Sequence, residues 1–239
     1  STLMRSSAAS DVYKRQKKYC KDKRLASIRN WITTGDIYSK EFGYNELPWK
    51  LDIFDRGTYK DNPMKFTVVC TDINTGKPVY HQCPNGDVED IEWMRASASI
   101  PVVSRPVKLG GKQLLDGGVS DPIPVEWMLK QGYEKNIVVL TRDINYRKTA
   151  NPRMMMFLKA VLHKYPALLE DLEKRHIHYN ETLEKLGSLE KAGRVHIIRP
   201  SQPVKAAMIE RDADNLERIY QMGRSDMEKD LEQLRAYLH

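Results

Sequence analysis

Long apolar runs are missing from this sequence. A membrane-spanning helix needs roughly 18 uninterrupted apolar residues, and nothing in the 239 residues approaches that length. Cysteine is also scarce. Cys20, Cys70 and Cys83 are an odd number without the spacing of metal ligands, which favours a reducing compartment such as the cytoplasm over a disulfide framework. The odd number of cysteines argues against a disulfide-stapled domain. No repeat or low-complexity tract appears after residue 16, so a repeat array is excluded.

The charge balance indicates which partners the protein attracts. The formal net charge is +7, and residues 1–16 supply about two of these charges. Modest basicity favours contact with anionic surfaces such as a phospholipid membrane. Nucleic acid is the weaker interpretation, because the basic residues are dispersed among acidic ones and no recognition signature is present. The hydrophobic content of 41% supports one substantial core, as in an α/β domain.

The most informative stretch is Asp116-Gly117-Gly118, which directly follows the apolar pair Leu114-Leu115. A glycine pair there lets the backbone take a positive φ and lets another group approach closely, so we expect the Asp116 carboxylate to be displayed rather than merely solvated. The alternative is an ordinary turn, since Asp-Gly and Gly-Gly are common turn dipeptides.

The surrounding pattern favours a functional carboxylate. Residues 106–115 read as a hairpin with Gly110-Gly111 at its turn. Upstream we expect a strand at 65–72 paired with one near Val79 and Tyr80, and then a helix at 87–99 with Asp87 or Asp90 near its cap. Downstream, residues 121–124 open a short helix, and residues 137–140 form a buried strand. Asp116 is therefore predicted at a strand end in an α/β layer, where such folds usually place their sites.

Several ordered motifs resemble the bacterial branch of the patatin-like phospholipase family. They run collinearly from Phe66 to Lys148: Phe66-Thr-Val-Val-Cys-Thr-Asp72, Thr75-Gly-Lys77, Arg95-Ala-Ser-Ala-Ser-Ile-Pro101, Asp116-Gly-Gly118 with Asp121 and Pro124, Thr141-Arg142, and Tyr146-Arg-Lys148. The resemblance implies a three-layer α/β/α domain and hydrolysis of a lipid ester by a Ser-Asp dyad. Asp116 would be the base, within the motif that Gly117 and Gly118 complete. The dyad needs no histidine, metal or other cofactor.

The sequence departs from this family pattern in one respect. It contains no Gly-x-Ser-x-Gly elbow and no glycine-rich oxyanion loop, and neither Ser97 nor Ser99 lies on an elbow flanked by glycines. Residues 6–16 resemble the in-frame translation of a transposon-type sequencing adapter, and residues 1–5 fit the preceding adapter and index. We therefore hypothesise that residues 1–16 are not native and that the upstream half of the domain, with its nucleophile, is missing. A genuine flexible tail is the rival explanation.

This hypothesis predicts that the chain alone is inactive and folds poorly, because a sheet that has lost its central strands exposes apolar faces. The alternative function is a non-catalytic lipid-binding or scaffolding relative that lacks the elbow. The predicted organisation is an adapter-like tail at 1–16, the C-terminal portion of the hydrolase domain at 17–150, and a mostly helical extension at 151–239 with one strand near 195–199.

Within the extension, the pattern predicts a Met-rich helix from Asn151 that covers the sheet, with a lipid-facing lid as the alternative. Two further helices are expected at the end, one closing at Gly223 and the other capped by Ser225. His176 and His178 lie two residues apart, which places them on different faces of a helix, so no metal pair is expected there.

Overall fold

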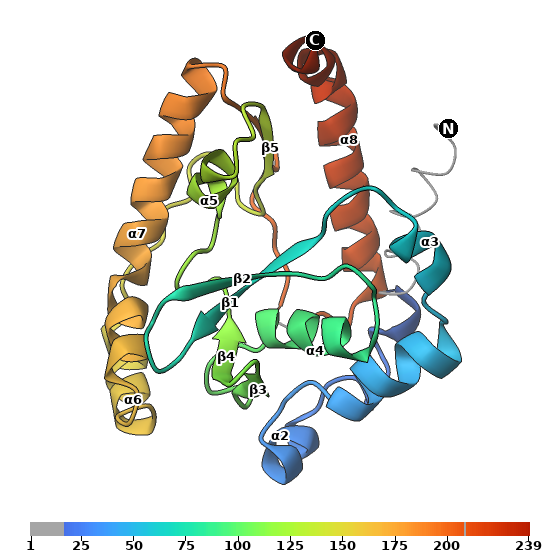
Figure 1. The fold of residues 1–239 in the computed structure, drawn as a ribbon, viewed down its shortest axis with the longest axis vertical. Coiled ribbons are helices and arrows are strands. Elements are labelled where there is room, and N and C mark those ends of the chain that lie inside the picture. Colours follow the sequence, from blue (N-terminus) through green and yellow to red (C-terminus); the bar gives the residue numbers. More distant parts are fainter. Residues whose placement is uncertain (1–16, 208) are drawn as a thin grey trace. The chain divides into compact units, whose positions relative to one another are not determined.

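A computed structural model describes residues 17–207 and 209–239 of the chain and shows a mixed α/β fold (Figure 1). The expectations about residues 1–16 fall outside the described residues. The chain forms two compact units that interleave along the sequence. The Asp116 unit contains Ala26–Pro124 and Lys148–Glu181, and the C-terminal unit contains residues 17–25, Val125–Arg147 and the described part of Thr182–His239. These units are defined by contacts within the chain. The predicted domain boundaries, 17–150 and 151–239, stay a prediction.

The Asp116 unit is built on a four-stranded antiparallel sheet. Its strand order is β2 (Pro78–Gln82), β1 (Thr67–Asp72), β4 (Lys112–Asp116) and β3 (Val107–Leu109). The predicted hairpin is confirmed as the β3–β4 pair, and Gly110 and Gly111 at its turn have φ values of 55° and 71°. Two successive positive φ angles are what a two-residue hairpin turn of this kind requires, and glycine takes them without strain.

Helices cover both faces of this sheet. Successive side chains of the two central strands point to opposite faces, and both faces are apolar. On one face, Cys70 of β1 and Leu114 of β4 pack with Trp93 of helix α4 (Val88–Ser97). On the other face, Leu115 packs with Leu168 of helix α7 (Pro166–Lys191). Helix α4 runs alongside the sheet in Figure 1, and its predicted cap is confirmed, since the Asp87 side chain accepts a hydrogen bond from the N–H of Asp90.

The remaining elements of the Asp116 unit are short. They are α2 (Ile28–Thr34), a π-helix η1 (Glu41–Leu51), α3 (Arg56–Lys60) and α6 (Pro152–Val161), with the first turns of α7. Helix α6 begins as predicted: the Asn151 side chain accepts from the N–H of Met154, and Pro152 occupies the first turn, where its missing N–H costs nothing.

The C-terminal unit contains a two-stranded parallel sheet. Strands β5 (Asn136–Val139) and β6 (Val195–Ile198) pair in register, Asn136 opposite Val195. Helix α5 (Val125–Lys130) precedes β5, and helix α8 (Ala213–Leu238) follows β6. Helix α8 packs on β6 through His196, whose Nε2 lies 2.6 Å from Oδ2 of Asp230.

The prediction of two helices at the end of the chain is wrong, because α8 is continuous across Gly223 and Ser225. A glycine inside a helix costs only about 1 kcal/mol. Partly buried apolar residues on both sides of it, such as Ile219 and Met227, keep one face of α8 packed. The mixed α/β class and the helical C-terminal end agree with the prediction, whereas the full three-layer domain stays a prediction.

Candidate functional site

Asp116 is the last residue of β4, as predicted, and its backbone is fixed on both sides. Its N–H donates to the carbonyl of Ser99 at 2.8 Å, and its own carbonyl accepts from Oγ1 of Thr71 at 2.8 Å. Ser99 follows α4 and Thr71 belongs to β1. The position of the carboxylate therefore depends on the strand pairing and on the end of α4 together.

The Asp116 side chain is half-buried and makes one local hydrogen bond. Its Oδ1 accepts from the N–H of Gly118 at 2.6 Å. A charged acceptor makes such a bond short and strong. The other oxygen, Oδ2, has no hydrogen bond to any described residue, so it is the atom available to an incoming group.

The two glycines of the motif are required because a side chain at either position has no room, not because the backbone needs a positive φ. Neither Gly117 nor Gly118 has a positive φ, so that part of the prediction is wrong. The close approach is confirmed, because a Cβ on Gly117 would lie 2.2 Å from the carbonyl oxygen of Val69. A Cβ on Gly118 would lie 2.9 Å from Oδ1 of Asp116. Any side chain at either position would displace β1 or the carboxylate.

Sequence reasoning missed Arg175, which holds the same turn from helix α7. Its Nε donates to the carbonyl of Gly118 at 2.7 Å. The bond joins positions far apart in the sequence, and no local pattern marks one arginine among the many charged residues of this helix. Arg175 orients the backbone next to Asp116 without contacting the carboxylate oxygens through any hydrogen bond in the described part of the chain.

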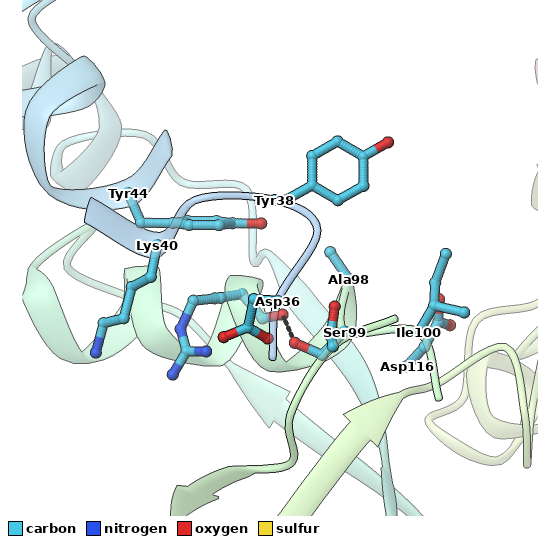
Figure 2. Close-up of a pocket in the computed structure, with 10 residues that line it drawn as sticks. Asp36, Tyr38, Lys40, Tyr44, Ala98, Ser99, Ile100 and Asp116 are labelled. Carbon is cyan, nitrogen blue, oxygen red and sulfur yellow. Dashed lines mark hydrogen bonds between the residues drawn. The ribbon is translucent and has the colours of Figure 1, made fainter. Parts of the chain in front are cut away.

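A cavity of about 360 Å³ opens beside Asp116. Figure 2 shows Asp116 and Ile100 at one end, Ala98 and Ser99 in the middle, and Lys40 and Tyr44 at the other end. The full lining also includes Asp36, Tyr38, Arg95 and Ser104. Its volume is in the range of small-molecule sites, which are mostly apolar with a few polar groups.

At the end of the cavity away from Asp116, two basic side chains form ion pairs with Glu92. Arg95 lies 2.8 Å from the Glu92 carboxylate and Lys40 lies 3.1 Å from it. Burial alone would raise the pKa of Glu92, but the hydrogen bonds from Arg95 and Lys40 outweigh it and hold that pKa below its ordinary value. Burial also raises the pKa of the Tyr44 hydroxyl, which stays protonated at neutral pH.

Ser97 and Ser99, the two serines considered above as nucleophiles, have structural roles. The hydroxyl of Ser97 donates to the carbonyl of Val69 at 2.6 Å, and that of Ser99 donates to the carbonyl of Arg95 at 2.8 Å. Ser97 belongs to the last turn of α4 and Ser99 follows it by two residues. Their hydroxyl groups satisfy nearby carbonyls, so neither has the exposed hydroxyl of a nucleophile.

One group of side chains outside the cavity has the composition of a metal site. Possible ligand atoms of His81, Cys83 and Asp90 lie within 4.8 Å of one another. Each group already has a structural partner. His81 stacks on Trp93 at 3.9 Å, and Oδ2 of Asp90 accepts two backbone N–H groups, at 2.6 and 2.7 Å. Burial, with Asp90 and Asp87 nearby, raises the pKa of Cys83 to about 12, so its thiol is protonated. These contacts hold the three side chains in place in the described structure.

The structure thus defines a mixed α/β protein that presents a strand-end carboxylate to a ligand-sized cavity. The model of the patatin-like phospholipase family matches residues 6–129, and the chain belongs to that family. The match begins at Ser6, inside the stretch for which we predicted an adapter origin, and that origin stays a prediction. A second family model, a domain of unknown function (DUF6363), matches residues 165–239.

Similar curated proteins add no assigned activity. Uncharacterized NTE family proteins of Mycobacterium bovis and of two Mycobacterium tuberculosis strains are each 40% identical to this chain over 63 residues. That stretch is 26% of this chain and 16% of each relative's length. Among the described helices, none is both long and apolar enough to cross a membrane.

Proposed function

We propose that this protein is part of a serine acyl hydrolase that cleaves lipid esters, with Asp116 as the general base. The observation that carries the proposal is the position of Asp116, at a strand end beside a cavity, in a chain of the patatin-like phospholipase family. The family supports the reaction class, lipid acyl hydrolysis. The dyad and the role of Asp116 are our assignments.

The proposed chemistry starts with removal of a serine proton. A serine hydroxyl is a weak nucleophile until an adjacent base takes its proton. We assign this proton to Oδ2 of Asp116, because Oδ1 already accepts the N–H of Gly118. The serine oxygen then attacks the ester carbonyl, and donors in an oxyanion hole stabilise the charge that develops on the carbonyl oxygen. The leaving alcohol recovers the proton from Asp116, and water hydrolyses the acyl-serine with Asp116 again as base.

The nucleophile and the oxyanion donors are assigned to a part of the protein outside these 239 residues. The sequence holds no Gly-x-Ser-x-Gly, and the hydroxyls of Ser97 and Ser99 are committed to carbonyl groups. The 239-residue chain alone is therefore expected to be inactive. We place the whole protein in the cytoplasm, with peripheral contact to an anionic membrane that contains its lipid substrate.

The missing elbow also favours a second candidate, a non-catalytic relative that binds lipid esters through the same cavity. The experiment that separates the two is a long read of the genomic locus upstream of the codon for Lys17. An open frame through a Gly-x-Ser-x-Gly elbow supports the hydrolase. A frame without that elbow leaves Asp116 without a partner and supports the binding protein.

The assignment of the base is tested on the full-length gene product. Asp116→Asn keeps the shape of the side chain and removes its basicity, so ester hydrolysis should fall about 10²–10⁴-fold. The matched control is Asp87→Asn, because asparagine caps a helix as well as aspartate does. Equal hydrolysis by the wild type and Asp116→Asn would refute the assignment.

A further inference from the structure

Helix α6 is apolar on nearly its whole circumference. Among its ten residues only Arg153 and Lys159 are charged. A helix that is apolar all round is usually found inside a core or in lipid. In this structure it lies on the surface of the Asp116 unit: Met156 is 72% exposed, and Met154, Phe157 and Val161 are each about half exposed.

The inner side of α6 explains how the helix is held in place. Met155 and Leu158 are half-buried, and Leu162, which follows the helix, packs against the core that contains Leu115 and Leu168. The spacing of three and four residues puts these side chains on one face. Met154, Phe157 and Val161 have the same spacing on another face and are exposed. Helix α6 therefore buries one apolar face and presents a second one outward.

The segment that carries the outward face is rich in basic residues. Between Asp143 and Glu170 the sequence has no acidic residue and five basic ones, Arg147, Lys148, Arg153, Lys159 and Lys164. Of these, Lys159 pairs with Glu173 of α7 at 3.0 Å. An exposed apolar helix face within a positively charged segment has the composition of a helix that lies in the plane of an anionic membrane surface.

A recess beside α6 has the same mixed character. It has a volume of about 380 Å³ and is lined by the apolar side chains of Met154, Met155 and Leu158 together with Lys148, Arg175 and one carboxylate, that of Glu173. Apolar groups thus continue from the outer face of α6 into a space that also presents two cationic side chains.

We propose that α6 is the membrane contact of this protein, with the side chains of Met154, Phe157 and Val161 inserted among the lipids. Arg153 and Lys164 attract the anionic head groups. The inference names the surface that brings the proposed hydrolase to its substrate and to that extent rests on the proposed function. Its test needs no catalysis.

The test is co-sedimentation of the full-length gene product with vesicles. One set contains phosphatidylcholine alone, and the other contains phosphatidylcholine and phosphatidylglycerol in equal parts. We expect binding to the second set, weakened by added salt because salt screens charges at a surface. Replacing two inserted side chains, Met154→Gln with Phe157→Gln, should weaken binding about tenfold or more, given the apolar area that is lost. Arg153→Gln with Lys164→Gln should weaken it by a similar factor, at roughly 1 kcal/mol per basic residue.

Two control variants match these changes elsewhere on the Asp116 unit. Phe66→Gln with Ile177→Gln replaces two other exposed apolar residues, and Lys60→Gln with Lys65→Gln removes the same positive charge. Both controls should bind as the wild type does. Equal binding by the α6 variants and the wild type would refute the proposal. So would vesicle-independent self-association that is lost in the α6 variants, since it would show an interface between copies of the chain.

The membrane contact through α6 and the proposed hydrolase function can be refuted independently of each other. Asp116→Asn should bind vesicles as the wild type does, because the carboxylate is outside the α6 surface. Vesicle binding with no hydrolysis by the full-length protein would leave the membrane contact in place and remove the catalytic assignment. Hydrolysis of a short water-soluble ester without vesicle binding would do the reverse.

Discussion

The two sheets of this protein differ in how well they are covered. In the four-stranded antiparallel sheet, Leu114 and Leu115 point to opposite faces and both are fully buried. In the two-stranded parallel sheet, Ile137 and Val139 of β5 are 45% and 69% exposed. Parallel sheets usually have both faces covered, so β5 carries apolar surface of the kind that other parts of a protein normally bury.

The difference follows from how each sheet is assembled along the chain. The antiparallel sheet contains two hairpins, β1–β2 and β3–β4, each closed by a short turn. Strands β5 and β6 are separated by α6 and α7, and their pairing depends on this long crossover. Local pairing is quickly formed and self-contained, whereas non-local pairing pays the loop-closure entropy first. Because both faces of its central strands are also buried, the antiparallel sheet is expected to be the more stable part.

The largest expected effect compares the cores of the two sheets. Leu114→Ala should reduce the free energy of unfolding by about 3 kcal/mol, because it leaves a cavity in a filled core. Val139→Ala should change it by less than about 0.5 kcal/mol, as exposed substitutions generally do. Urea unfolding followed by fluorescence measures both. A loss of similar size for Val139→Ala would show that β5 is covered in solution.

The next comparison uses one glycine from each unit. Gly117→Ala places a methyl group against the carbonyl of Val69 and should cost about 2 kcal/mol or more. Gly187→Ala, in the part of α7 within the C-terminal unit, meets no atom within 4 Å and should stabilise the protein by about 0.5–1 kcal/mol. Thermal melting of the two variants should therefore shift in opposite directions. A tolerated Gly117→Ala would contradict the close approach of β1 to the motif.

Two arginines give a smaller contrast. Arg175→Ala removes the bond to Gly118 and should cost about 1.5 kcal/mol, the usual range for a bond to a charged group. Arg224→Ala breaks an exposed pair with Glu228 on α8 and should leave the free energy of unfolding nearly unchanged, because solvent screens the pair. In the full-length protein, Arg175→Ala should also reduce ester hydrolysis while Arg175→Lys restores part of it. Equal activity of wild type and Arg175→Ala would limit this arginine to a role in stability.

The smallest expected effect is a pH dependence. Hydrogen bonds from Arg95 and Lys40 hold the folded-state pKa of Glu92 below 4.5, its ordinary value. The stabilisation from Glu92 is thus fully present above pH 4.5 and is lost as the pH falls through the folded pKa. Glu126 in the C-terminal unit has its pKa lowered by Lys185, but its side chain is 52% exposed and solvent screens the pair.

The measurement is urea unfolding at pH 7 and at acidic pH for Glu92→Gln and Glu126→Gln. Glu92→Gln should lose stability at pH 7 and show a weaker decline in acid than the wild type. Glu126→Gln should resemble the wild type at both pH values. An unchanged acid decline in Glu92→Gln would assign the effect to other carboxylates.

The features of this fold that could be predicted are those determined by residues adjacent in the sequence. Gly110-Gly111 specified the hairpin turn, Asp87 specified the start of α4, and both are confirmed. The contact of Arg175 with Gly118 could not be predicted, because it depends on where α7 packs after a long loop. Gly223 misled the prediction, since the packing of α8 on both sides of it outweighs the local preference for a helix end.

The same distinction between local and long-range features applies to the candidate site. The sequence placed Asp116 at a strand end, and the structure agrees. It did not indicate that Lys40 and Tyr44, from the segment before β1, reach the same cavity. No local pattern connects these residues to Asp116, because only the folded chain brings their segments together.

The buried thiols make this protein convenient for site-directed labelling. Burial raises the pKa values of Cys70 and Cys83 to about 12, and Cys20 is buried as well. A thiolate is the reactive form of cysteine, so maleimide reagents should not modify Cys70 or Cys83 while the protein is folded, and burial shields Cys20. A fluorophore attached after Met156→Cys would then report from α6 alone, with every native cysteine left in place.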